Sequence, residues 1–139
     1  MPSTPPLRIV YMGTSDFAVP ALEALIDSRH EVVGVFTQPD RKSGRGKKLR
    51  PPPVKEVAAA HDIPVYQPET VDNDEALEIL REWEPDVAVV AAYGQILPDS
   101  LLEVPRLGCV NIHASLLPKY RGAAPINWAI VEGDETTGV

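Results

Sequence analysis

The segment 108–118 holds the residue types best suited to chemistry. It reads Gly-Cys-Val-Asn-Ile-His-Ala-Ser-Leu-Leu-Pro, an apolar run interrupted by two polar side chains, Asn111 and His113. Side chains two apart on a strand point to one face, so the amide and the imidazole are expected together at the strand's carboxyl end. Open α/β sheets bind ligands at that end. The pattern favours a reaction centre over the alternative of a structural histidine beside a turn-forming asparagine.

An Asn–His pair without a nucleophile is suited to stabilising a carbonyl oxygen that becomes negatively charged. The amide and a protonated imidazole both donate hydrogen bonds to such an oxyanion. The sequence has no serine–base pair, no cysteine–histidine elbow and no metal-ligand spacing, and Cys109 is expected to be a buried, inert thiol. The attacking group is therefore predicted to be an amine on a second substrate. Such a transfer normally needs a carboxylate to orient His113, and no convincing candidate is visible.

Basic residues are concentrated in one segment, although the net charge of the chain is −7. Residues 41–50 hold six of the 13 lysines and arginines and no acid. A local contact with a polyanion and a solvated, flexible loop both fit this cluster. The acidic remainder argues against broad, non-specific nucleic-acid binding.

The chain has the length and composition of one globular domain. Its 139 residues are 44% hydrophobic, and no apolar run approaches the ~20 residues of a membrane span. Residues 1–6 lack signal-peptide features and are expected to be a disordered lead before a domain at 7–139. A single cysteine is typical of a cytoplasmic protein.

Strand and helix patterns alternate along the chain. We predict strands at 7–12, 32–37, 64–66, 86–92 and 107–112, helices at 16–28, 54–61, 73–83, 99–102 and 124–131, and a long loop at 38–53. This order predicts a doubly wound, mainly parallel α/β sheet whose strand-end loops face one crevice. Thr14 or Ser15 is expected to cap the first helix. The loop after Gly13 lacks a full dinucleotide fingerprint, so NAD is not expected.

Several motifs resemble those of one enzyme family. They are Gly13-Thr-x-Asp-Phe-Ala, Phe36-Thr-Gln-Pro-Asp-Arg41, Gly44-Arg-Gly-Lys-Lys-Leu49, Pro53-Val-Lys55, Tyr93-Gly-x-Ile-Leu-Pro98, Asn111-Ile-His-x-Ser-Leu-Leu-Pro118 and Arg121-Gly-Ala-Ala-Pro125. On these segments, residues 7–139 resemble the N-terminal part of the methionyl-tRNA formyltransferases, within the folate-dependent formyltransferase family. The Asn-x-His and Ser-Leu-Leu-Pro segments are family-wide, whereas Gly-Arg-Gly-Lys-Lys is more particular to the tRNA enzymes.

The resemblance implies a reaction and a set of site residues. The formyl group of 10-formyltetrahydrofolate would pass to the amino group of methionyl initiator tRNA, in translation initiation, with Asn111 and His113 stabilising the oxyanion. Tetrahydrofolate would contact Ser115, Leu116, Leu117, Pro118, Tyr93, Gly94, Ile96 and Leu97. The tRNA would contact Arg41, Arg45, Lys47 and Lys48.

The resemblance also bears on which parts of the enzyme this chain holds and on which alternative functions stay open. The family's third catalytic group, an aspartate, and its C-terminal β-barrel follow the point where this chain stops, at Val139. We therefore expect a Rossmann-like fragment truncated at its C-terminal end, inactive by itself, from a monomeric enzyme with no metal. The alternatives are a sugar-nucleotide formyltransferase, against which the basic segment argues, and a non-catalytic folate- or tRNA-binding module.

Overall fold

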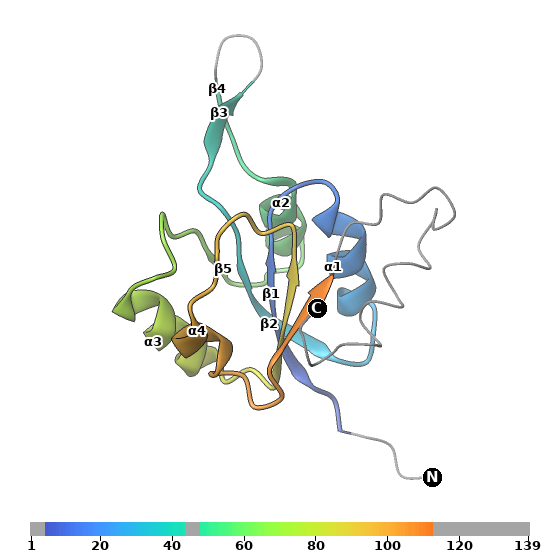
Figure 1. The fold of residues 1–139 in the computed structure, drawn as a ribbon. Coiled ribbons are helices and arrows are strands. Elements are labelled where there is room, and N and C mark those ends of the chain that lie inside the picture. The colour runs from blue at the N-terminus through green and yellow to red at the C-terminus, as the bar shows by residue number, and fades with distance from the viewer. Residues whose placement is uncertain (1–4, 44–47, 113–139) are drawn as a thin grey trace, which may run out of the picture.

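The computed structural model describes residues 5–43 and 48–112 (Figure 1). Five parallel strands form the main sheet, in the order β5-β2-β1-β6-β7. They are β1 (Arg8–Gly13), β2 (Glu31–Phe36), β5 (Val65–Tyr66), β6 (Val87–Ala91) and β7 (Cys109–Ile112). The helices are α1 (Ala18–Ile26), α2 (Pro53–Ala60), α3 (Asp74–Trp83) and α4 (Asp99–Leu102). None of these described helices has the length and apolar character needed to cross a bilayer.

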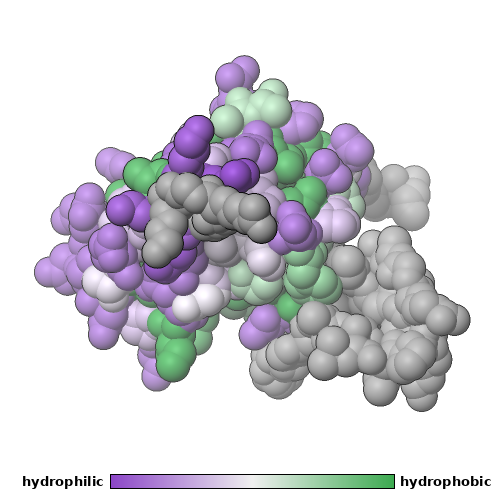
Figure 2. All heavy atoms as spheres, turned by 90° about the horizontal axis from the view of Figure 1, so that it is seen from above, coloured by the Kyte–Doolittle hydropathy of each residue, from purple (hydrophilic) through white to green (hydrophobic). Residues whose placement is uncertain are grey.

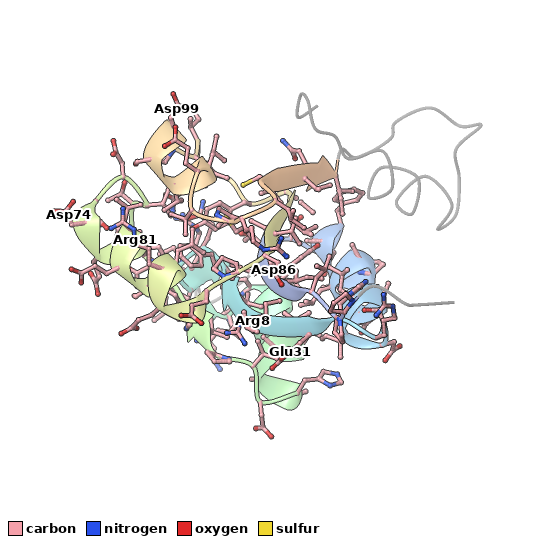
Figure 3. All side chains as sticks on the ribbon, turned by 90° about the horizontal axis from the view of Figure 1, so that it is seen from below. Arg8, Glu31, Asp74, Arg81, Asp86 and Asp99 are labelled. Carbon is pink, nitrogen blue, oxygen red and sulfur yellow. The ribbon has the colours of Figure 1, made fainter. Side chains whose placement is uncertain are left out.

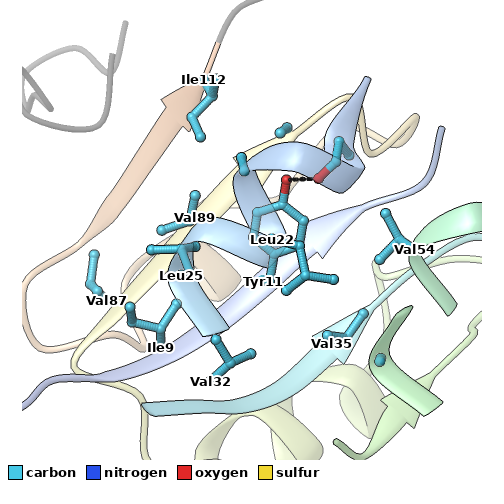
Figure 4. Close-up of a cluster of buried hydrophobic side chains, with 14 residues drawn as sticks. Ile9, Tyr11, Leu22, Leu25, Val32, Val35, Val54, Val87, Val89 and Ile112 are labelled. Atoms are coloured by element: carbon cyan, nitrogen blue, oxygen red, sulfur yellow. Dashed lines mark hydrogen bonds between the residues drawn. The ribbon is translucent and has the colours of Figure 1, made fainter. Parts of the chain in front are cut away.

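Helices cover both faces of the sheet, which confirms the predicted doubly wound α/β class. Alternate side chains of β1 enter two separate cores. Ile9 and Tyr11 pack with α1 and α2, and Val10 and Met12 pack with α3 and α4. In the first core the Tyr11 hydroxyl donates a 2.6 Å hydrogen bond to the Ala18 carbonyl (Figure 4). This contact ties the first turn of α1 to the central strand.

The strand order defines where a ligand would enter. From β1 the chain adds β2 and β5 on one side, and it then crosses to the other side to add β6 and β7. The loops that follow β1 and β6 therefore leave the sheet in opposite directions. In open α/β sheets this switch point, at the carboxyl ends of the strands, is where ligands bind. We call this side of the molecule the carboxyl edge.

The helix starts show where local sequence signals hold and where they fail. Pro53 begins α2, as predicted for the first helical position, and the Asn73 side chain accepts a hydrogen bond from the main-chain nitrogen of Ala76 at the start of α3. The cap predicted for α1 is wrong. This helix begins at Ala18 without a side-chain cap, because the Thr14 hydroxyl donates instead to the Tyr93 carbonyl, at 2.8 Å.

The predicted loop at 38–53 is also wrong in part, because it contains a hairpin. Strands β3 (Arg41–Ser43) and β4 (Lys48–Arg50) pair antiparallel and project beyond the carboxyl edge (Figure 1). Arg41, Lys42 and residues 48–50 are exposed, and the sequence of the two strands shows no apolar alternation. Backbone pairing rather than burial makes this hairpin. The helix predicted at 124–131 lies outside the described residues.

Candidate active site at the carboxyl edge of the sheet

Asn111 lies at the carboxyl end of β7, as the sequence predicts. It pairs with Val90 of β6, and its side chain is exposed. Its neighbours Val110 and Ile112 pack into the core beneath α1 and α2, while Cys109 packs on the other face with α3 and α4. Alternation therefore places Asn111 on the Cys109 face. An exposed amide at this position can donate a hydrogen bond to a ligand at the edge. His113 lies outside the described residues, as do Ser115, Leu116, Leu117 and Pro118.

The loop after β6 turns sharply at the switch point. Ala92 has φ 51° and Gly94 has φ 99°, both in the region that favours glycine. Between them the Tyr93 side chain is only 2% exposed and packs in the core with α3 and α4, so it supports the loop from beneath. Ile96 is 93% exposed, and Leu97 packs against that same core. The loop thus offers a glycine and an isoleucine to the surface.

Hydrogen bonds join the loops that follow β1, β2 and β6. The Thr14 hydroxyl donates to the Tyr93 carbonyl at 2.8 Å and accepts from the Gln38 main-chain nitrogen at 3.4 Å. The Gln95 side-chain amide donates to Gln38 Oε1 at 2.9 Å and to the Pro68 carbonyl at 3.2 Å. These contacts cross between segments that are far apart in the sequence. They hold the walls of the predicted crevice in one arrangement.

A second polar cluster lies where the hairpin meets the sheet. Asp40, the residue before β3, accepts a hydrogen bond from Gln67 Nε2 at 2.7 Å and another from Lys55 Nζ at 3.1 Å. Gln67 Nε2 also donates to the Gln38 carbonyl, at 3.1 Å. The hydrogen bond from Gln67, and then that from Lys55, lowers the pKa of the half-buried Asp40 carboxyl. Asp40 is therefore an anion at neutral pH, fixed by groups from the loop after β5 and from α2.

The hairpin presents cations to solvent at this edge. Arg41, Lys42, Lys48 and Arg50 are exposed, and Leu49 between them is 64% exposed. Seen from above in Figure 2, the end of the molecule that carries the hairpin is largely hydrophilic, with separate hydrophobic patches. Arg45 and Lys47 lie outside the described residues. The described part of the hairpin therefore carries the positive charge that a contact with a polyanion needs.

Two buried hydroxyls near the ends of β2 and β6 have no hydrogen-bond partner within residues 5–43 and 48–112. They are Thr37 Oγ1 and the Tyr93 hydroxyl. Burial, with a smaller effect of the nearby Tyr66, raises the pKa of Tyr93, so its hydroxyl stays neutral. Unsatisfied buried hydroxyls are costly and uncommon. A buried water, or a residue outside 5–43 and 48–112, could supply the missing partners.

Sequence reasoning missed the polar side chains that hold these loops together. Gln38, Gln67 and Gln95 each follow a strand of the main sheet, and each bonds to a loop other than its own. Gln38 and Gln95 lie within motifs noted in the sequence, but a single glutamine in a loop belongs to no periodic pattern that would single it out. The shared position after a strand's end is the one clue that could have found them.

Comparison with known proteins decides the family. The model of the formyl transferase family matches residues 7–139. The chain belongs to the formyl transferase family. It is 59% identical over 133 residues to the methionyl-tRNA formyltransferase of Alkaliphilus oremlandii, which covers 96% of this chain and 43% of that protein. It is 61% identical over 132 residues to the methionyl-tRNA formyltransferase of Trichlorobacter lovleyi, covering 95% of this chain and 42% of that protein. The chain thus spans less than half the length of these curated relatives.

Solved structures agree on the fold of this formyl transferase chain. A phosphoribosylglycinamide formyltransferase from Bacillus halodurans superposes with a TM-score of 0.55 at 24% identity, over 89% of this chain and 64% of that one. A formyltetrahydrofolate deformylase from Pseudomonas syringae gives a TM-score of 0.54 at 24% identity, over 93% of this chain and 43% of that one. At this level of identity the likeness concerns architecture, and it confirms the predicted Rossmann-like formyltransferase topology.

Proposed function

We propose that the protein carrying this chain transfers the formyl group of 10-formyltetrahydrofolate to the amino group of methionyl initiator tRNA. The observation that carries the proposal is the 57–61% identity to relatives named methionyl-tRNA formyltransferase. The geometry supports it, because an exposed amide and a basic hairpin occupy the same edge of the sheet. Donor and acceptor would therefore meet at the switch point of the fold.

In this reaction the enzyme's residues act without a covalent intermediate. The methionyl amine forms a bond to the formyl carbon, the bond from that carbon to the folate nitrogen breaks, and the amine's proton passes to the folate nitrogen. The formyl oxygen carries negative charge between these steps. Asn111 donates a hydrogen bond to this oxygen from the end of β7, with His113 as the second donor two residues on.

The two substrates would occupy different parts of the carboxyl edge. We assign tetrahydrofolate to the loop after β6, through Gly94, Ile96 and Leu97, with Tyr93 beneath them and the segment 115–118 as a further wall. The 93% exposure of Ile96 supports this assignment, because a large apolar side chain there is suited to contact with a ring system.

The acceptor tRNA would meet the hairpin. We assign phosphate contacts to Arg41 and Lys48, and to Arg45 and Lys47 in the same basic segment. Contacts to phosphates fix the position of a nucleic acid, and they make its binding depend on salt. The hairpin would then bring the 3′ end of the tRNA towards Asn111.

The test uses the full-length protein and compares two acceptors. Formyl transfer from 10-formyltetrahydrofolate is measured with charged initiator tRNA and with an amino-sugar nucleotide. We expect the tRNA to be formylated and the sugar nucleotide to be ignored. Preference for the sugar nucleotide, or folate binding with no transfer to either acceptor, would contradict the proposal.

Asn111→Ala tests the catalytic assignment. Loss of one oxyanion donor is expected to lower kcat by about 100-fold or more, with the KM for tRNA nearly unchanged. Cys109→Ala, on the same face of β7 and bonded only weakly to the Leu102 carbonyl at 3.8 Å, is the matched control and should keep kcat within about twofold. An unchanged kcat for Asn111→Ala would remove Asn111 from the mechanism.

A further inference from the structure

We propose that Asp40 is a positioning residue that sets the direction in which the basic hairpin leaves the carboxyl edge. The proposal rests on the proposed function, because it assigns the hairpin's orientation a role in tRNA use. Asp40 is the last residue before β3, and its side chain is 32% exposed. The hairpin side chains beyond it, Arg41 and Lys42, are exposed. The contacts of Asp40 therefore fix the base from which β3 departs.

The two partners of Asp40 come from different elements of the fold. Lys55 lies in the first turn of α2 and approaches Asp40 Oδ1 to 3.1 Å. Gln67 follows β5 and donates to the same oxygen at 2.7 Å. Two donors from two directions restrain a carboxylate more than one donor does, and charged hydrogen bonds are the stronger kind. The carboxylate is thereby held against both α2 and the loop after β5.

The same contacts join the hairpin to the loop we assign to folate. Gln67 Nε2 also donates to the Gln38 carbonyl at 3.1 Å, and Gln38 Oε1 accepts from Gln95 at 2.9 Å. Gln95 lies between Gly94 and Ile96. A continuous series of hydrogen bonds thus runs from the hairpin base to the loop after β6. This series would hold the tRNA-binding hairpin in a fixed position relative to the loop after β6, where we place the formyl donor.

The sign of the charge separates positioning from simple attraction. Asp40 is an anion beside a segment of cations that would bind a polyanion. If net charge alone governed tRNA use, removing Asp40 would strengthen it. If Asp40 positions the hairpin, removing it weakens tRNA use despite the gain in positive charge. The two accounts predict opposite changes from one substitution.

The chain offers a matched control at the opposite edge of the sheet. Asp86 accepts from the main-chain nitrogen of Arg8 at 2.8 Å and from Arg106 Nε at 3.1 Å, and its side chain is 21% exposed. Figure 3, seen from below, shows Arg8 and Asp86 at this edge. Asp86 therefore resembles Asp40 in being partly exposed and in accepting from two donors, one of them a cation, but it lies at the end of the sheet away from the hairpin. Asp86→Asn changes the charge equally without touching the hairpin base.

The kinetic experiment uses full-length Asp40→Asn, Asp40→Ala, Gln67→Leu and Asp86→Asn. We expect Asp40→Ala and Gln67→Leu to raise the KM for charged initiator tRNA about tenfold, and Asp40→Asn to raise it less, because the amide oxygen still accepts one hydrogen bond. The KM for 10-formyltetrahydrofolate should stay within about twofold in all four variants. Asp86→Asn should leave both values unchanged. A lower or unchanged KM for tRNA in Asp40→Ala and Gln67→Leu would overturn the proposal.

A second readout does not depend on tRNA. Trypsin cleaves after lysine and arginine, so its initial rate within residues 41–50 reports how firmly the hairpin is held at its base. We expect cleavage about tenfold faster in Asp40→Ala and Gln67→Leu than in the unsubstituted protein or Asp86→Asn. Equal rates would overturn the proposal even if tRNA is a substrate. If the unsubstituted protein does not formylate tRNA, the proposed function fails, and faster cleavage would still establish the restraint by Asp40.

Discussion

Gly94→Ala should be destabilising for two separable reasons. The backbone at Gly94 has φ +99°, and an added Cβ would lie 2.6 Å from Gln38 Nε2. The positive φ costs an alanine about 1–2 kcal/mol. Relief of the contact moves the Gln38 amide, whose Oε1 accepts from Gln95, and loss of that hydrogen bond costs about a further 1 kcal/mol. The free energy of unfolding should therefore fall by about 2–3 kcal/mol.

Gly108→Ala isolates the first of these terms. Gly108 has φ +88°, and an added Cβ there would meet no atom within 4 Å. Its alanine variant should lose only the backbone cost, about 1–2 kcal/mol. The difference between the two glycine variants then measures the contact with Gln38.

Urea unfolding of the full-length variants provides the measurement. Trp83 is a suitable fluorescent reporter, because its ring packs edge-on to Phe36 with centroids 5.7 Å apart. Adding Gln38→Ala to Gly94→Ala removes the contact, so alanine at Gly94 should cost about 1 kcal/mol less in that background. The reasoning is refuted if Gly94→Ala costs no more than Gly108→Ala, or if the double variant shows no coupling.

Three further predictions follow from buried or paired groups. Tyr93→Phe should raise the free energy of unfolding by about 1 kcal/mol, because the hydroxyl has no partner within the described residues. A lower free energy of unfolding in the same urea assay would mean that another segment bonds to this hydroxyl. The pKa of Asp86 is lowered by the Arg8 main-chain N–H and then by Arg106, so its contribution to stability is complete above its ordinary pKa of 3.8 and is lost as pH falls below it. Asp86→Asn should therefore differ from the unsubstituted protein less at about pH 3 than at pH 5 in urea unfolding, and a constant difference would contradict this. Burial raises the pKa of Cys109 to about 11, so about one thiol in a thousand is ionised at pH 8. Iodoacetamide should therefore react slowly with Cys109 until urea is added, and fast reaction in the folded protein would contradict this prediction.

The fold could be predicted because its signals are periodic. Strand β6 is a run of five buried residues, and α3 has both a capping asparagine and an apolar face. Alternation of such elements leaves little choice but a parallel sheet with helices on both faces. Asn111 could be placed at the carboxyl end of its strand for the same reason, since a strand's end and face follow from its spacing.

The parts that could not be predicted depend on contacts between loops. The Thr14 hydroxyl had a local role available as a helix cap, but it bonds to Tyr93, which is 79 residues away. In the sequence Asp40 is a single acid next to a basic segment, and its two donors lie 15 and 27 residues further on. Strands β3 and β4 pair through their backbones and bury little, so hydrophobic patterning does not mark them. No local pattern in the sequence marks such contacts, because they form between segments that only the fold brings together.

The hairpin has a consequence for how this family could be re-engineered. None of the described residues of β3 and β4 contributes to either hydrophobic core. Changes of length or charge in this hairpin therefore need no compensating repacking, provided that its base at Asp40 is kept. If the hairpin binds the acceptor as proposed, acceptor choice and thermal stability can be varied separately in this architecture. A library confined to 41–50 could be screened for new amine acceptors on one unchanged scaffold.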